Sequence, residues 1–177
     1  MTVSTADPCL FFRKRAEKSL YIAIYVDDGI VIGSDQAEID DFLEQLKKVF
    51  KITVGTLENY LGMKITCGRE GISISQVRYV ERMLEQYGMG DCNSVATPAT
   101  SEACEDSEKL PDSVPYRGAA GSLMHLSGAT RPDISFAVSK AARKLENPTV
   151  EDWNSVKRIF RYLRGTTEFS ILVEKTR

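Results

Sequence analysis

The 177-residue sequence is poor in the side chains that build metal–thiolate sites, disulfides and covalent active sites. It contains four cysteines and a single histidine, His125. No two cysteines form a C-x-x-C pair, and one histidine leaves a zinc site short of ligands. The serine, cysteine and histidine residues do not form a nucleophile-and-base set. These absences argue against a zinc domain and against nucleophilic catalysis by serine or cysteine.

Long apolar runs and phosphate-binding loops are missing as well. No stretch approaches the ~20 apolar residues of a membrane span, and no secretory signal opens the chain. The glycines form neither a G-x-x-x-x-G-K-[ST] nor a G-x-G-x-x-G loop. Hydrophobic residues still make up 42% of the sequence, enough for one sizeable domain or two small ones. We expect a soluble, intracellular protein with reduced thiols and no membrane partner.

The net charge of −2 is no global signature of a nucleic-acid-binding protein. The distribution along the chain is more informative than the total. Residues 131–177 contain 10 basic and 6 acidic residues, whereas residues 91–130 contain 2 and 6. The average therefore hides a basic C-terminal third.

The stretch Tyr21–Ser34, YIAIYVDDGIVIGS, is the most informative part of the sequence. Aromatic and β-branched residues flank the adjacent carboxylates Asp27 and Asp28, and Asp28-Gly29 is a strong signal for a hairpin turn. The pattern places both carboxylates at the tip of a buried hairpin. One interpretation is an ordinary tight turn. The other is a cation site, because Mg²⁺ takes carboxylates plus substrate phosphates and would offset the cost of burying two like charges.

The rest of the chain alternates between short strand patterns and amphipathic helices. Residues 1–20 are interpreted as a lead-in that ends in a basic cluster. Asp35 and Glu38 predict a capping-box start to a helix whose apolar face packs on the hairpin. The other expected elements are strands at 50–54, 60–66, 71–75 and 169–174, and helices at 76–87, 116–127, from Pro132 to about Pro148, and at 151–164. Residues 91–115 are acidic and contain three prolines, which predicts a linker or an ordered surface loop.

Basic residues recur on the last two expected helices. Lys157, Arg161 and Arg164 are spaced i, i+4 and i+7 and should share one helix face. The preceding helix carries three more, Lys140, Arg143 and Lys144. Together the six could follow a phosphate backbone. The alternative is that they form an ordinary solvated helix surface.

Eight motifs follow one another in a fixed order. They are DPCLFF (Asp7–Phe12), YVDD (Tyr25–Asp28), LGMKI (Leu61–Ile65), SQ-x-x-YV (Ser75–Val80), ATP (Ala96–Pro98), YRGAAGSLMHL (Tyr116–Leu126), TRPDI (Thr130–Ile134) and VKRIFRYLRGT (Val156–Thr166). YVDD alone is moderately specific. The ordered set is very specific, and it closely resembles the reverse transcriptase of copia-type LTR retrotransposons.

The resemblance implies an RNA-directed DNA polymerase with a right-hand architecture. It places the YVDD hairpin in the palm and moves its turn to about Val26-Asp27, one step earlier than the Asp-Gly pattern suggests. Asp27 then matches the principal Mg²⁺ ligand and Asp28 its neighbour. Tyr25 and Val26 match positions at the primer terminus and the incoming nucleotide. The primer grip, which holds the primer 3′ end, is matched by Leu61, Gly62 and Met63.

The resemblance also implies an α+β fold class and a division of the chain. The expected parts of this partial right-hand fold are a partial palm with both hairpins (1–75), a first thumb-like helix (76–90), an acidic linker (91–115) and a helical thumb or connection (116–177). The implied cofactor is Mg²⁺, for which Mn²⁺ can substitute. The implied partners are an RNA template with a DNA primer, deoxynucleoside triphosphates and the remaining Pol polyprotein with fingers, ribonuclease H and integrase. The implied location is cytoplasmic, in a virus-like particle as in the family, or nuclear.

The chain departs from the family pattern around the YVDD hairpin. The family carries a third catalytic aspartate on an earlier strand, but the only acids before Asp27 are Asp7 and Glu17, and neither matches. The fingers are missing, and the sequence stops near where the ribonuclease H domain would begin. We therefore expect the isolated chain to be inactive, or nearly so, as a polymerase and to expose apolar palm surface.

Three hypotheses stay open at this point. The first is a fragment of a reverse transcriptase that performs two-metal nucleotidyl transfer in the full-length protein. The second is a non-catalytic remnant that binds nucleic acid through its basic helices. The third is a relic that never folds stably.

Overall fold

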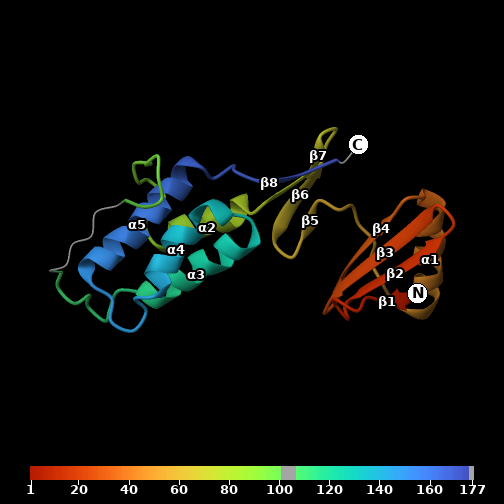
Figure 1. Ribbon diagram of the computed structural model, residues 1–177, viewed down its shortest axis with the longest axis horizontal. Helices are drawn as coiled ribbons and strands as arrows, with labels where there is room; N and C mark the ends of the chain where they lie inside the picture. Colours follow the sequence, from red (N-terminus) through yellow and green to blue (C-terminus); the bar gives the residue numbers. More distant parts are fainter. Residues whose placement is uncertain (101–106, 176–177) are drawn as a thin grey trace. The chain divides into compact units, whose positions relative to one another are not determined.

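The computed structural model describes residues 1–100 and 107–175 (Figure 1). Over these residues the fold is α+β, with two antiparallel sheets, five α-helices and one 3₁₀ helix. The expected fold class is therefore confirmed. The chain divides into two compact units, Met1–Leu61 and Gly62–Arg177, and each is described by itself. Among the described residues, no helix is both long and apolar enough to cross a membrane.

The first unit is an antiparallel sheet with one helix. Its strands follow the chain order and are β1 (Thr2–Val3), β2 (Leu10–Arg15), β3 (Lys18–Tyr25) and β4 (Asp28–Gly33). The interpretation of residues 1–20 as a lead-in is wrong, because β2 pairs with β3 along its whole length, from Leu10 opposite Ala23 to Arg15 opposite Lys18. The basic cluster thus flanks a two-residue turn.

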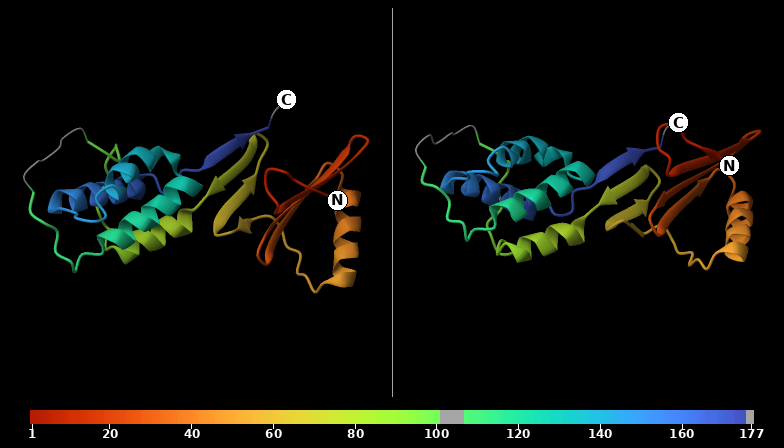
Figure 2. Two further views of the ribbon diagram at one scale, coloured as in Figure 1. Left: turned by 60° about the horizontal axis from the view of Figure 1, so that its bottom comes forward. Right: turned by 90° about the horizontal axis from the view of Figure 1, so that it is seen from below.

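Helix α1 (Gln36–Val49) lies along one face of this sheet (Figure 2). Asp35 caps it as predicted, accepting a hydrogen bond from the Glu38 backbone N–H at 3.1 Å. The Glu38 carboxylate lies instead 3.6 Å from the Arg13 guanidinium of β2. Gly33 allows the close packing of α1 on β4, since a Cβ there would stand 2.9 Å from Ile39 Cγ1.

The strand expected at 50–54 does not form. Phe50 is the C-cap of α1, and no ladder partner is present for the following residues in the part of the chain that the structure describes. Most side chains from 51 to 58 are exposed, so no buried face stabilises a strand. The chain regains regular structure at β5 (Asn59–Tyr60).

The second unit contains the antiparallel strands β6 (Met63–Cys67), β7 (Gly71–Ser75) and β8 (Ile171–Glu174). The expected final strand is confirmed, and it pairs with β7 from about 100 positions earlier in the sequence. Gly71 has φ +152°, and a Cβ there would lie 2.0 Å from the Val173 carbonyl oxygen. Glycine is thus required at the start of β7, where it pairs with the end of β8.

Four helices form the body of the second unit. They are α2 (Val77–Gln86), α3 (Tyr116–Ala129), α4 (Ser135–Ala142) and α5 (Val150–Gly165), with the 3₁₀ helix η1 (Pro132–Ile134) before α4. The helix expected to run to about Pro148 ends at Ala142. Residues 143–147 form turns and bends instead, Pro148 accepts a hydrogen bond from the Leu110 N–H, and Thr149 caps α5. Glycine ends α2 as predicted, with Gly88 at φ +65°.

Most of the buried apolar residues lie among these helices. Side chains such as Leu123, Leu126 and Phe160 are fully buried between α2, α3, α4 and α5. In the first unit, Leu20 and Ile22 are the only buried apolar side chains among the described residues. The second unit therefore has a complete core, and the first has little more than one layer of side chains under α1.

The described parts of 91–115 form an ordered surface loop. Leu110 is buried in the core, and Lys109 bridges to Thr149 ahead of α5. The Val150 N–H also donates to the Glu108 carbonyl, so residues 108–109 are bonded to the start of α5. The acidic residues at 102, 105 and 106 lie outside the described residues.

Candidate functional site

The YVDD hairpin turns at Val26-Asp27. Tyr25 and Asp28 are the last paired residues of β3 and β4, so Val26 and Asp27 form a two-residue loop. This agrees with the turn implied by the family resemblance. The turn inferred from the Asp28-Gly29 pattern is wrong, because Gly29 lies within β4 opposite Ile24.

The register is fixed at the other end of the hairpin. Ser19 donates its N–H to Ser34 Oγ at 2.9 Å and accepts from the Ser34 N–H at 3.0 Å. One residue further out on each strand, the Lys18 ammonium pairs with the Asp35 carboxylate at 2.8 Å. A later turn would slide β4 along β3 and break these contacts.

Val26 has an unusual backbone conformation for its residue type. Its φ is +53°, in the left-handed region that β-branched residues avoid, and its side chain is 82% exposed. Apolar burial cannot offset the strain at such an exposed position. Strained backbone of this kind clusters at functional sites, at a cost of about 1–3 kcal/mol per residue.

The two carboxylates are exposed, so the expectation of a buried hairpin tip is wrong. Asp27 and Asp28 are both open to solvent, and neither forms an ion pair within the described residues. Solvent exposure therefore removes the cost of burying two like charges, and with it that argument for a bound cation. Their oxygens are nevertheless the donors that Mg²⁺ prefers. No cluster of three or more His, Cys, Asp or Glu side chains suited to a metal occurs in residues 1–100 and 107–175. The pair thus fits part of a coordination shell.

Asp28 shares one side of the sheet with aromatic and apolar side chains. Residues directly opposite each other in an antiparallel pair project from the same face. Tyr25 pairs with Asp28 and Tyr21 pairs with Ile32, so these four lie on one side. Tyr25 is 61% and Ile32 53% exposed. The expectation of exposed apolar surface next to the hairpin is confirmed.

Tyr60 lies close enough to the hairpin for the charge of Asp28 to affect the pKa of its hydroxyl. Burial, and secondarily the negative charge of Asp28, raise the pKa of the Tyr60 hydroxyl. The phenol therefore stays protonated over a wider pH range than a free tyrosine. It is a hydrogen-bond donor near the carboxylate pair that the motif analysis did not single out.

The residues matched to the primer grip form a second tight turn. Leu61 and Gly62 have φ of +50° and +77°, and Met63 begins β6. Two consecutive positive φ values are typical of a type I′ hairpin turn. The strand expected at 60–66 is therefore interrupted at its second and third residues. Contact with a primer stays a prediction.

The six basic residues do not all lie on helix surfaces as expected. Lys140 is in α4, but Arg143 is its C-cap and Lys144 follows in the turn. All three side chains are exposed. Their contact with nucleic acid stays a prediction.

Of the three α5 residues in this predicted set, two are used inside the fold. Arg161 Nε donates to the Asn93 carbonyl at 2.8 Å, and Arg164 Nε donates to the Gly90 carbonyl at 2.7 Å. Arg158, one turn earlier, donates to Thr97 Oγ1 at 3.0 Å. These three arginines hold the segment 90–97 against α5. Lys157 forms no such bond among the described residues.

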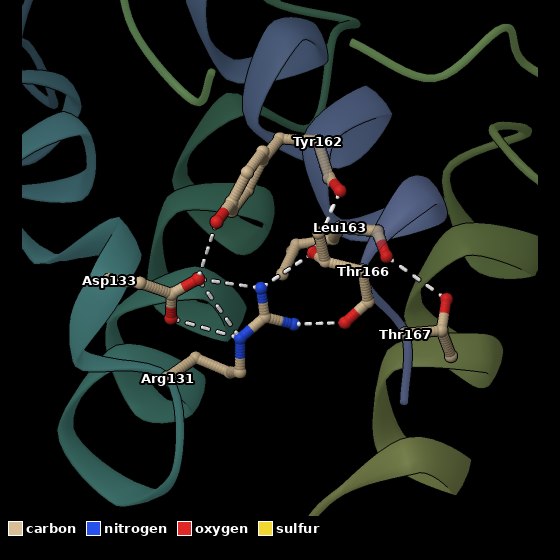
Figure 3. A network of polar contacts seen from close by, with 6 residues as sticks. All are labelled: Arg131, Asp133, Tyr162, Leu163, Thr166 and Thr167. Atoms are coloured by element: carbon tan, nitrogen blue, oxygen red, sulfur yellow. Dashed lines mark hydrogen bonds and ion pairs between the residues drawn. The ribbon is translucent and has the colours of Figure 1, made fainter. Parts of the chain in front are cut away.

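The most extensive polar network in the helical unit centres on Arg131 (Figure 3). Its side chain is 3% exposed and pairs with the Asp133 carboxylate at 2.7 Å. Arg131 also donates to the Thr166 carbonyl oxygen at 2.9 Å and to Thr166 Oγ1 at 2.7 Å. Tyr162 donates its hydroxyl to Asp133 at 3.0 Å. The network ties η1 to the end of α5.

Electrostatics at Asp133 follow from this arrangement. Burial alone would raise the pKa of the carboxyl, but the hydrogen bond and charge of Arg131 outweigh it and lower the pKa. The guanidinium also lies over the rings of Tyr162 and Phe169, at 5.7 and 5.3 Å from their centroids. Residue spacing gave no sign of this network. The only available signal was the presence of Arg131 and Thr166 in the TRPDI and VKRIFRYLRGT motifs.

Comparison with known proteins identifies the family. The family model described as "Reverse transcriptase (RNA-dependent DNA polymerase)" matches residues 2–101. The chain is 38% identical, over 92% of its length, to the Retrovirus-related Pol polyprotein from transposon TNT 1-94 of Nicotiana tabacum. It is 36% identical, over 97% of its length, to that from transposon RE2 of Arabidopsis thaliana.

The chain spans only 13% and 12% of the length of these two polyproteins. It spans 66% of an uncharacterized mitochondrial protein of Arabidopsis thaliana, to which it is 32% identical over 88% of its own length. No solved structure matches the chain. The motif order, the hairpin geometry and these relatives agree, and the chain belongs to the reverse transcriptase family, as part of a copia-type retrotransposon Pol polyprotein.

Proposed function

We propose that this chain is the palm and thumb part of an RNA-directed DNA polymerase and supplies two carboxylates of its two-metal site. The observation that carries the proposal is the YVDD hairpin. Its two-residue turn presents Asp27 and Asp28 side by side in sequence, both exposed and both without an ion pair in the described part of the chain.

In this proposal the carboxylate oxygens of Asp27 and Asp28 hold Mg²⁺ together with the nucleotide phosphates. When bound, the metal neutralises charge that develops on the phosphate oxygens during nucleotidyl transfer. Tyr25 and Val26 present the apolar surface next to the carboxylates, where the primer terminus and the incoming deoxynucleoside triphosphate would lie. The primer grip would be the turn Leu61, Gly62 and Met63.

The basic residues of the helical unit would bind the backbone of the template–primer duplex. Lys140, Arg143, Lys144 and Lys157 carry charges that no carboxylate of the described residues neutralises. Arg161 and Arg164 use only Nε in the fold, so their terminal nitrogens can still donate to phosphates. The remaining Pol polyprotein would supply the third aspartate, the fingers and the ribonuclease H and integrase activities.

A metal titration tests the carboxylate site. We expect Mn²⁺ to broaden the backbone amide NMR signals of Val26–Gly29 selectively at submillimolar concentration. Asp27→Asn/Asp28→Asn should abolish the broadening. Asp40→Asn/Asp41→Asn in α1, the other adjacent pair of exposed aspartates in the same unit, is the matched control and should leave it intact. Equal broadening at both pairs would mean non-specific attraction and would count against the site.

A second candidate function is nucleic-acid binding without catalysis. It is favoured by the lack of a third metal-binding side chain around the pair in residues 1–100 and 107–175. Such a remnant would bind duplexes with salt-dependent affinity but would not require Asp27 or Asp28. Unchanged duplex affinity and salt slope in Lys140→Glu/Lys157→Glu would remove this candidate.

A further inference from the structure

A small concave site lies between α4, α5 and the segment before residue 101, within the helical unit. Its volume is about 90 Å³, which is room for several water molecules. Lys140 and Lys144 line it from the end of α4, and Arg158 lines it from α5. The hydroxyls of Ser155 and Thr100 complete the polar part of the wall.

The charge in this pocket is not balanced by the residues around it. Asp152 is the only acid among the described residues of the wall, and its carboxylate already accepts hydrogen bonds at the N-terminus of α5. Asp152 Oδ2 accepts from the Thr149 N–H at 2.8 Å and from Thr149 Oγ1 at 2.9 Å. Neither lysine has a carboxylate within salt-bridge distance in the described part of the chain. Three cationic side chains and one carboxylate therefore line the described part of the pocket, which has a net positive charge.

Arg158 is held in place before any ligand binds. Its terminal nitrogen donates to Thr97 Oγ1 at 3.0 Å, which fixes the guanidinium against α5. Its Nε is buried and has no hydrogen-bond partner among the described residues. The Lys140 ammonium lies 5.9 Å from the centroid of the Phe136 ring. A fixed guanidinium beside two ammonium groups is suited to a tetrahedral oxyanion, because arginine donates in a planar fork and lysine acts as a point charge.

We propose that this pocket binds a single phosphate group. Lys140 in α4 and Lys144 in the turn after it place like charges on one wall, and a bound phosphate would offset their repulsion. The apolar part of the wall, Ala137 and Ile159, strengthens the interaction by excluding water from one side. The phosphate could come from a nucleic-acid backbone, which rests on the proposed function, or from a free phosphate or mononucleotide, which does not.

The test is a phosphate titration of the 177-residue protein, followed by backbone amide NMR at constant ionic strength with chloride as the reference anion. We expect saturable shifts at Lys140, Lys144 and Arg158 at millimolar phosphate. Lys140→Gln/Lys144→Gln should weaken binding at least tenfold. Arg78→Gln/Arg82→Gln in α2 removes two exposed basic residues with the same spacing outside the pocket and should leave binding unchanged.

A second titration identifies the source of the phosphate. If an RNA–DNA duplex displaces inorganic phosphate from the pocket, the backbone is the ligand. If duplex and phosphate bind together, the ligand is a free phosphate or mononucleotide, and both results support the pocket. Shifts that are equally large with chloride, or equally weakened by Arg78→Gln/Arg82→Gln, would overturn the proposal. The readout involves neither Asp27 nor metal, so failure of the polymerase proposal leaves it interpretable.

Discussion

Val26 shows at the scale of one residue how this hairpin differs from an optimal one. A two-residue hairpin turn favours Gly, Asn or Asp at positive φ, yet this turn has an exposed valine at +53°. The Asp28-Gly29 pair, which looked like the turn, was a misleading local signal. Gly29 is not required by its backbone, since a Cβ there would meet only the Ala23 carbonyl at 3.8 Å.

We predict that Val26→Gly stabilises the protein. Glycine removes the strain of the left-handed conformation, and the expected gain in free energy of unfolding is about 1 kcal/mol after the entropic cost of glycine. Urea unfolding of the first unit would measure it. Ala23→Gly, in β3 with ordinary extended backbone, is the control and should destabilise by about 0.5–1 kcal/mol. A loss of stability in Val26→Gly would show that the turn is not strained.

Arg131 is the residue whose removal should cost most in the helical unit. Arg131→Met would leave Asp133 with only the Tyr162 hydroxyl and the Thr166 carbonyl without its donor, and we expect a loss of roughly 2–4 kcal/mol in the free energy of unfolding. Arg78→Met on the exposed side of α2 should change stability by no more than about 0.5 kcal/mol. Thermal and denaturant unfolding would compare the two variants.

The Arg131–Asp133 pair also predicts that the free energy of unfolding depends on pH in the acid range. The pKa of Asp133 is lowered in the folded protein, because Arg131 outweighs the opposing effect of burial. Its contribution is therefore complete above the ordinary carboxyl pKa near 4 and is lost as the pH falls through the lowered value. Arg131→Met should flatten this part of the stability profile. An unchanged acid limb would contradict the role given to the pair.

At the scale of elements, helices with end signals were predictable and long-range pairings were not. Asp35 and Gly88 mark a helix start and a helix end in the sequence and do so in the structure. The strand at Leu10–Arg15 was missed because its evidence lies in the register with β3. The Thr149–Asp152 capping box was missed too, although its spacing was readable.

Segment 90–97 has no regular secondary structure of its own and is held by hydrogen bonds from arginines of α5. Arg161 and Arg164 donate to its carbonyls, and at Gly165 a Cβ would stand 2.8 Å from Ser94 Cβ. We predict that Arg161→Gln/Arg164→Gln increases hydrogen exchange of this segment at least tenfold while the α3 amides stay protected. Lys157→Gln, on the same helix, is the control and should leave exchange unchanged. Equal exchange in all three proteins would mean that backbone packing alone holds the segment.

At the scale of the whole molecule, the two units differ in how much they bury. The α+β class and the family followed from the sequence because the motif order is specific. The exposure of Asp27 and Asp28 did not, because alternating apolar residues do not reveal how few of them are covered. Leu20 and Ile22, at 0% and 7% exposure, are the only buried apolar side chains described in the first unit, against a continuous core in the second.

We predict that the two units unfold in separate transitions. Trp153, the single tryptophan, lies against the core of the second unit and reports on it alone. Far-ultraviolet circular dichroism reports on both, so its transition should begin at lower urea concentration than the fluorescence transition. Coincident curves would mean one cooperative unit. No transition at all would favour a relic without a stable fold.

The most direct test of the account is primer extension by this 177-residue protein on an RNA template with a DNA primer, in Mg²⁺ and in Mn²⁺. The account predicts no extension but salt-dependent binding of the template–primer, because no third metal-binding side chain joins Asp27 and Asp28 in the described residues. Extension that Asp27→Asn/Asp28→Asn abolishes would contradict it and would mean that the chain completes a working site by itself.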